Sequence, residues 1–269
     1  MPTIIKIFYM NSKKIIENIT DWLKSYSLKS NTNGFVIGVS GGVDSAVTST
    51  LCAKTGLPVL CLDLPILQSK DEHNRAVSHI KWLKNKHDNV FLKSIDLSKT
   101  FSSFQNSVQI SSNKNNLLSL ANSRSRLRMV TLYYFSALKK YIVVGTGNKV
   151  EDFGIGFYTK YGDGGVDISP IADLLKSDVY SLAKFYNIND QIIEAIPTDG
   201  LWNDNRNDED QIGASYEELE KAMLNDNKVD NDLSAREKEV LKIYKSLNSS
   251  NRHKMLAIPV CKIPKDYIR

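Results

Sequence analysis

The sequence predicts an α/β protein with a doubly wound parallel sheet and helices on both faces. Short apolar, β-branched runs at 35–39, 59–64 and 90–95 are typical of buried strands. Helix-like segments alternate with these runs, which favours parallel strands joined by crossover helices. A glycine-rich turn directly follows the first run, and ligands of such sheets bind at the carboxyl ends of the strands.

The remaining elements follow from hydrophobic periodicity and from glycine and proline breaks. Ile15, Ile19 and Leu23 recur at helical spacing, and Gly56 ends the helix that follows the glycine-rich turn. The predicted helices cover 12–28, 70–86, 118–140, 174–186, 189–196, 215–225 and 234–247, with a fourth strand at 141–146. The apolar stripe expected on the long helix is Leu120, Leu127, Val130, Tyr134 and Leu138. Loops are predicted at 105–117 and 203–211, and an extended proline-containing tail ends the chain.

The turn Ser40-Gly41-Gly42-Val43-Asp44-Ser45 is the main functional motif. Its two glycines permit a tight turn and close approach of a ligand to the backbone. The N–H groups of a helix N-terminus favour an anion such as a phosphate, and Asp44 is suited to hold its Mg²⁺. The motif lacks a Gly-Lys-Ser/Thr ending and a G-x-G-x-x-G pattern. The alternative for this turn is a plain glycine-rich turn with a helix-capping Ser or Asp.

Composition narrows the class of protein. The 269 residues can form one large domain or two small ones, and without repeats or linkers we expect a single domain over 1–269. The net charge of +5 suits anionic nucleotides but does not demand nucleic acid. No apolar run has the length of a membrane span, and we do not interpret the start as a signal peptide. Cys52 and Cys61 lie in apolar runs and are expected to be buried free thiols, which fits a reducing cytoplasm.

A second informative stretch runs from 145 to 167. It is glycine-rich, dense in acids and contains aromatic side chains, which favours a functional loop over disorder. Before it, the long helix carries Arg124, Arg126 and Arg128. At about 100° per residue, Arg124 and Arg128 share one face and Arg126 points to nearly the opposite one. These arginines form either a solvated basic face or a set in which at least one side chain is aimed at a ligand.

Together the two stretches resemble bacterial NAD synthetases, a family within the N-type ATP pyrophosphatases. The resemblance rests on Ser-Gly-Gly-x-Asp-Ser at 40–45, on Gly145, Thr146 and Glu151, and on Phe-Tyr-Thr-Lys-Tyr-Gly-Asp-Gly-Gly-x-Asp at 157–167. It covers about 15–260 and implies an adenine nucleotide alpha hydrolase-like fold. The activity it implies is amidation of a nicotinic acid nucleotide (deamido-NAD) by ATP and ammonia, through an acyl-adenylate and with release of AMP and pyrophosphate.

The resemblance also assigns residues. ATP binding is implied for Gly38, Val39, Ser40, Gly41, Gly42, Val43, Asp44, Ser45, Thr146, Lys176 and Thr198. Deamido-NAD binding is implied for Arg126, Lys160, Asp167, His253 and Lys254. Asp44 and Glu151 would bind Mg²⁺, and catalysis is expected from Asp44, Glu151 and Lys176. The more ordinary roles for these residues are helix caps for the two acids, a surface lysine, and a surface histidine at His253.

The chain departs from the family pattern at two places. Gly147 and Asn148 stand where many members have Asp and His, and Asp199-Gly200-Leu201-Trp202 follows Thr198. The second change puts Trp202 beside the predicted site. There it would stack on the base of the acceptor, block one end of the acceptor channel, or serve as a packing anchor. The acceptor therefore stays open between the dinucleotide and nicotinic acid mononucleotide, which would make the protein an NMN synthetase.

Two competing functions stay open beside this one. The first is another adenylating enzyme with the same loop, such as a tRNA-thiolating enzyme or GMP synthetase, and the second is a catalytically silent nucleotide-binding protein. The cysteines lack the sequence context of a glutaminase, so free ammonia is the expected nitrogen source unless another protein supplies it. The resemblance implies a homodimer, with the helix at 118–140 as an interface element and no nucleic acid or membrane partner.

Overall fold

The fold is described from a computed structural model, over residues 10–68, 70–108, 114–198, 200–201, 207–226 and 233–268. Trp202 lies outside these ranges, so the sequence-based expectation for it stays a prediction.

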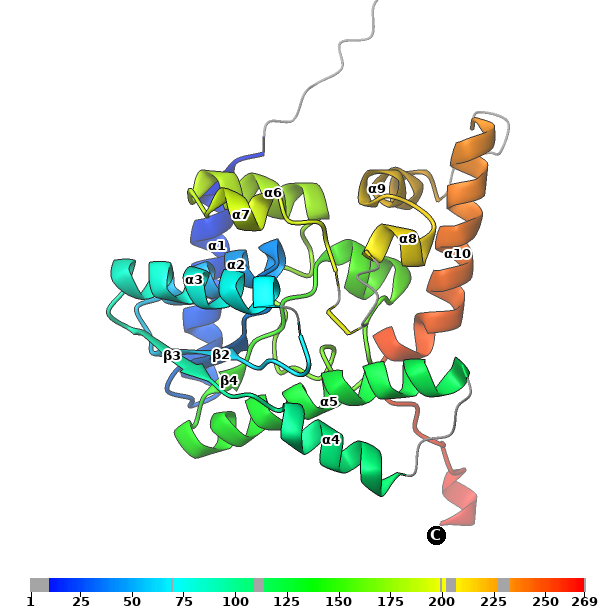
Figure 1. Ribbon diagram of the computed structural model, residues 1–269. Helices are drawn as coiled ribbons and strands as arrows, with labels where there is room; N and C mark the ends of the chain where they lie inside the picture. The colour runs from blue at the N-terminus through cyan, green and yellow to red at the C-terminus, as the bar shows by residue number, and fades with distance from the viewer. Residues whose placement is uncertain are drawn as a thin grey trace, which may run out of the picture.

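A four-stranded parallel sheet organises the molecule (Figure 1). Its strand order is β3-β2-β1-β4. The strands are β1 (Phe35–Gly38), β2 (Val59–Asp63), β3 (Val90–Ser94) and β4 (Ile142–Val143). Phe35 pairs with Val59 on one side and with Ile142 on the other, so β1 is central. Every residue of β2 is buried, as expected for a parallel strand covered on both faces.

Helices cover both faces, which confirms the doubly wound prediction. One face packs on a core that includes Phe35, Ile37, Leu51, Ile80 and Leu182. Its helices are α1 (Ser12–Lys29), α2 (Val43–Lys54), α3 (Lys70–Lys86), α6 (Lys176–Phe185) and α7 (Asp190–Ile193). The opposite face packs against α4 (Ser98–Ser107) and α5 (Lys114–Lys139) around Phe101 and Phe135.

The C-terminal part has a hydrophobic cluster of its own, formed by helices that Figure 1 shows beside the sheet. The π-helix η1 (Val150–Ile155) packs there with three α-helices. These helices are α8 (Asp208–Ile212), α9 (Tyr216–Asn225) and α10 (Ala235–Met255). A short 3₁₀ helix, η3 (Lys265–Tyr267), lies in the exposed tail. Because η1 directly follows β4, this cluster brings α9 to the carboxyl ends of the strands.

Several predicted elements need correction. The predicted bounds of the loop at 105–117 were wrong at both ends, because α4 continues to Ser107 and α5 begins at Lys114. Part of the loop at 203–211 is helix α8, and the helix predicted at 234–247 continues to Met255. The fourth strand is shorter than predicted and covers only Ile142–Val143. None of the described helices is both long and apolar enough to cross a membrane.

The predicted apolar stripe of α5 divides into two parts. Leu120 and Leu127 pack against the sheet core, as expected. Val130, Tyr134 and Leu138 are instead 58%, 62% and 63% exposed. They follow one another at helical spacing of four residues, so they form one ridge on the outer side of α5. The predicted stripe is therefore buried only at Leu120 and Leu127.

Candidate active site

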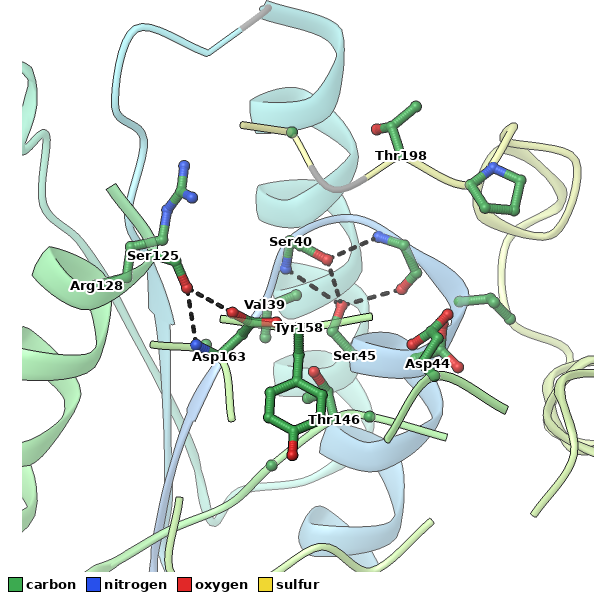
Figure 2. A pocket seen from close by; sticks show the side chains of 18 of the residues that line it. Val39, Ser40, Asp44, Ser45, Ser125, Arg128, Thr146, Tyr158, Asp163 and Thr198 are labelled. Atoms are coloured by element: carbon green, nitrogen blue, oxygen red, sulfur yellow. Dashed lines mark hydrogen bonds between the residues drawn. The ribbon is translucent and has the colours of Figure 1, made fainter. Parts of the chain in front are cut away.

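The glycine-rich turn joins β1 to α2. Gly41 has φ +86°, and a Cβ atom there would lie 2.8 Å from the backbone oxygen of Glu72, so this position requires glycine. The hydroxyl of Ser45 donates to the carbonyl of Gly42 at 3.0 Å and accepts from the amide of Ser40 at 3.2 Å. The serines therefore fold the turn back onto the first turn of α2 (Figure 2).

Three charged side chains from three elements meet next to this turn. Asp44 comes from the first turn of α2, Glu151 from η1 and Lys176 from the start of α6. The Nζ atom of Lys176 lies 2.6 Å from Asp44 Oδ2 and 2.9 Å from Glu151 Oε1, and the lysine is only 3% exposed. Burial acts to lower the pKa of Lys176, but the two carboxylates outweigh it and raise the pKa above its ordinary value. Lys176 is therefore charged.

Asn148 supports this cluster, which gives a physical account of one departure from the family pattern. Its side-chain amide donates to Asp44 Oδ1 at 3.1 Å. Its side-chain oxygen accepts from the amides of Val150 and Glu151 at 3.0 and 3.2 Å. One side chain thus fixes a carboxylate of α2 and begins the π-helix that carries Glu151.

A cavity of about 270 Å³ opens at the carboxyl ends of the strands. All residues predicted to bind ATP line it except Gly41. They are Gly38, Val39, Ser40, Gly42, Val43, Asp44, Ser45, Thr146, Lys176 and Thr198. Glu151 lines the cavity too, and the hydroxyl of Thr198 donates to Glu72 Oε1 at 2.9 Å. Figure 2 shows Asp44 on one side of the glycine-rich turn and Asp163 with Ser125 on the other, with Tyr158 between them.

The residues predicted to bind deamido-NAD do not line this cavity. Arg126 donates to the carbonyl of Lys160 at 3.3 Å, and Lys160 donates to the carbonyl of His253 at 2.8 Å. Lys254 donates to the carbonyls of Gly156 and Tyr158, so these four residues meet at the 156–160 loop. Asp167 has other partners and accepts from the hydroxyl of Tyr133 at 2.9 Å and from the amide of Val143 at 2.8 Å.

The three arginines of α5 point as predicted. Arg124 donates to the carbonyl of Leu201 at 2.7 Å, and Arg128 donates to the carbonyl of Leu64 at 3.0 Å. Both therefore reach loops on the cavity side, and Arg128 lines the cavity. Arg126 is exposed and contacts the 156–160 loop instead.

Sequence reasoning missed several acids of the cavity wall. Asp163 accepts from the hydroxyl of Ser125 at 2.6 Å, and burial raises its pKa. Burial, together with Glu151, Asp163 and Asp44 nearby, raises the pKa of Asp152 to about 8. The only sequence signal for Asp152 was its place directly after Glu151. Tyr216 was also missed, although its hydroxyl donates to Glu151 Oε1 at 2.6 Å.

Gly147 lies against Asp152. A Cβ atom on Gly147 would overlap the carboxylate of Asp152, so a side chain at 147 would require that carboxylate to move. The departure at 147 and the acid at 152 are therefore physically linked.

The parallel sheet, the glycine-rich turn and the buried acid–lysine cluster define an α/β protein with a candidate nucleotide site at the carboxyl ends of its strands. Comparison with known proteins is more specific. The NAD synthase family model matches residues 15–257, and the chain belongs to this family.

The relatives agree with this assignment. An NH₃-dependent NAD⁺ synthetase of Syntrophomonas wolfei is 34% identical over 259 residues, which are 95% of this chain and 98% of the relative. One from Finegoldia magna is 36% identical over 219 residues, 80% of this chain and 86% of the relative. Among solved structures, an NMN synthetase of Francisella tularensis superimposes with a TM-score of 0.82 at 31% identity and covers 96% of this chain and 100% of its own. An NH₃-dependent NAD synthetase of Campylobacter jejuni gives 0.75 at 30% identity, with 94% and 100% covered.

Proposed function

We propose that this protein is an ammonia-dependent NAD⁺ synthetase, a ligase that converts deamido-NAD, ATP and ammonia to NAD⁺, AMP and pyrophosphate. One observation carries the proposal. In a chain of the NAD synthase family, Lys176 binds Asp44 and Glu151 directly beside a phosphate-type turn, inside a cavity. The intact turn and cluster disfavour a catalytically silent nucleotide-binding protein. Family membership disfavours a tRNA-thiolating or GMP-forming enzyme.

In the first step, the nicotinate carboxylate attacks the α-phosphorus of ATP and pyrophosphate leaves. The turn from Gly38 to Ser45 holds the phosphates at the N-terminus of α2. Lys176 pairs with phosphate oxygens, and Thr146 and Thr198 face the nucleotide from the cavity wall. These groups accelerate the step by positioning the reactants and by neutralising charge.

Asp44 and Glu151 fit a divalent metal. One ammonium group already lies within 2.9 Å of an oxygen of each, so both carboxylates can bind a single cation. Among the described residues, no group of three or more His, Cys, Asp or Glu side chains converges on one point. Mg²⁺ commonly keeps waters and phosphate oxygens as its remaining ligands. When bound, Mg²⁺ would neutralise charge on the phosphates of ATP.

In the second step, ammonia attacks the acyl carbon of the acyl-adenylate. A C–N bond forms, the C–O bond to AMP breaks, and the nitrogen loses a proton. The cysteines of this chain lack the context of a glutaminase, so the ammonia is either free in solution or supplied by another protein. Cys52 and Cys61 are free and buried, which fits a reducing cytoplasmic location.

The acceptor nucleotide binds at Arg126, Lys160, Asp167, His253 and Lys254. These residues lie outside the cavity of one chain. A second copy of the chain would cover these residues and complete the acceptor site. The interface of this homodimer would include the exposed ridge of α5, since Tyr134 and Leu138 are more than half exposed on the same helix as Arg126.

A second candidate is an NMN synthetase that uses nicotinic acid mononucleotide. It is favoured by the TM-score of 0.82 to the protein from Francisella tularensis, over all of that chain. Pyrophosphate release, measured with ATP, ammonia and each acceptor in turn, tests both candidates. A higher kcat/KM for deamido-NAD supports the main proposal, a higher value for the mononucleotide supports the second, and no acceptor-dependent release contradicts both.

A further inference from the structure

Lys176 occupies the place between Asp44 and Glu151 that a metal would take. Its Nζ atom lies 2.6 Å from Asp44 Oδ2 and 2.9 Å from Glu151 Oε1. The side chain is 4% exposed, against 15% and 17% for the two acids. The ammonium group is therefore the innermost member of the cluster. The two carboxylates, which would otherwise repel one another, share its charge.

Neighbouring side chains hold this arrangement. The Tyr216 hydroxyl donates to Glu151 Oε1, the same oxygen that Lys176 contacts, and the Tyr216 ring centroid is 4.5 Å from Nζ. Asn148 donates to Asp44 Oδ1 at 3.1 Å. Tyr216 is itself fixed in the hydrophobic cluster of α9 and α10. Each carboxylate thus has a second donor, and the ammonium group has an aromatic face beside it.

A lysine and a divalent metal cannot share this place. Mg²⁺ binds carboxylate oxygens at about 2.0–2.1 Å. A metal bound by Asp44 Oδ2 and Glu151 Oε1, the two oxygens that Lys176 contacts, would therefore lie close to where Nζ now is. The two positive charges would also repel strongly in a buried site. The metal can enter only when Lys176 moves away. A buried ammonium group leaves two carboxylates at little cost only if another anion receives it.

The phosphates of ATP are the anions within reach. Lys176, Asp44 and the glycine-rich turn line one cavity. We propose that Lys176 is the resident cation of the Asp44–Glu151 pair, so that the divalent metal binds there only together with ATP, whose phosphates take over the lysine. The inference rests on the proposed metal and ATP sites, and it adds an order of binding to them.

The test measures Mg²⁺ binding by calorimetry on the full chain, without acceptor and ammonia. Wild-type protein, Lys176→Met and the charge-keeping control Lys176→Arg are each titrated without nucleotide and with the non-cleavable α,β-methylene analogue of ATP. We expect Lys176→Met to bind Mg²⁺ at least tenfold more tightly than wild type when no nucleotide is present. The analogue should tighten binding at least tenfold in wild type and much less in Lys176→Met, since coupling is reciprocal. Lys176→Arg should follow wild type.

Equally tight nucleotide-free Mg²⁺ binding by wild type and Lys176→Met would overturn the inference. Melting curves supply a readout independent of affinity. Mg²⁺ alone should leave the Tm of wild type unchanged and should raise the lowered Tm of Lys176→Met by several degrees. If Lys176→Met does not fold, the wild-type titrations with and without the analogue decide alone, because equal affinities contradict the inference.

Failure of the underlying site gives a different result. Asp44→Asn should abolish the Mg²⁺ binding that depends on the analogue. If Asp44→Asn binds metal and analogue as wild type does, Asp44 is not a ligand and the proposed metal site itself is wrong. These measurements involve neither the acylation step nor the amidation step. Their results therefore do not depend on which acceptor the enzyme uses.

Discussion

The charged groups of the cavity and those of the proposed acceptor region find different partners. In the cavity, Lys176 is paired with Asp44 and Glu151, all three on buried or nearly buried sites. In the acceptor region, Arg126, Lys160 and Lys254 donate to backbone carbonyls. None of these three forms an ion pair with another described residue at the distances of the cavity cluster. In the cavity, the single positive charge of Lys176 is therefore already paired with two carboxylates, whereas the acceptor region keeps positive charge for an anionic ligand.

This difference indicates how each region works. A buried, ion-paired cluster must exchange partners when ATP and metal bind, so changes there should affect chemistry most. The cations of the acceptor region are exposed or half-buried and can bind a phosphate without breaking an ion pair, so changes there should affect acceptor affinity. Because that region lies outside the cavity of one chain, acceptor binding should also depend on the proposed dimer.

The largest effect is expected for Asp44→Asn. The change removes one proposed metal ligand and one partner of Lys176, while Asn keeps the shape and the contact with Asn148. Loss of charge neutralisation should cost about 3 kcal/mol of transition-state stabilisation, or about a hundredfold in kcat. Pyrophosphate release at saturating Mg²⁺ and a melting curve are the measurements. Near-normal turnover would show that Asp44 has no catalytic role, and a lowered Tm would assign the loss to folding instead.

Tyr134→Glu tests whether the acceptor region needs the dimer. Tyr134 is 62% exposed on the ridge of α5, so the change should leave the monomer fold intact and place a charge in the proposed interface. We expect dissociation by light scattering and a loss of acceptor-dependent activity of about thirtyfold, or about 2 kcal/mol. Lys139→Glu, at the end of the same helix, controls for added negative charge. A dimeric, active Tyr134→Glu protein would exclude this ridge as the interface.

Arg126→Ala should separate the two regions. The guanidinium group is exposed, so its loss should raise the KM for the acceptor about tenfold and leave the Kd for ATP unchanged. Arg252→Ala is the matched control, because Arg252 is an exposed arginine of α10 beside His253. Steady-state kinetics give the acceptor KM, and ATP titration without acceptor gives the Kd. An equal loss of ATP affinity would place Arg126 in the nucleotide site.

Nearly all the residues that the sequence assigned to ATP line one cavity, whereas those assigned to the acceptor do not line it. The difference has a physical reason. The strands and the glycine-rich turn depend on local patterns, so 35–45 could be predicted from its own residues. The contact between Lys176 and Asp44 joins residues 132 positions apart, and only the family resemblance suggested it. The contact of Tyr216 with Glu151 and the closeness of Asp152 to the other acids depend on the π-helical geometry of η1 and on the packing of α9. No local sequence pattern reveals either of these. Helix α4 was missed because its Ser-, Asn- and Gln-rich sequence has one fully buried anchor, Phe101.

The smallest effect on activity is expected behind the cavity, at His79. His79 Nε2 lies 3.0 Å from the Ser49 hydroxyl, within the core between α2 and α3. Burial lowers its pKa from 6.5 to about 4. The unfolded chain therefore binds a proton between pH 6.5 and 4 that the folded chain does not. Stability from the neutral imidazole is fully present above pH 6.5 and is lost as the pH falls toward 4.

Urea unfolding at pH 7, 5.5 and 4.5 measures this loss. A shift of this size corresponds to about 3 kcal/mol of unfolding free energy over the whole range. His79→Gln should be less stable at pH 7, since glutamine does not match the imidazole, but its stability should depend less on pH across this window. His253→Gln, at an exposed histidine, should keep the wild-type dependence. If His79→Gln keeps the full wild-type dependence, another group causes the acid sensitivity. Activity at neutral pH should be nearly unchanged in His79→Gln wherever the protein stays folded, because no atom of His79 lines the cavity.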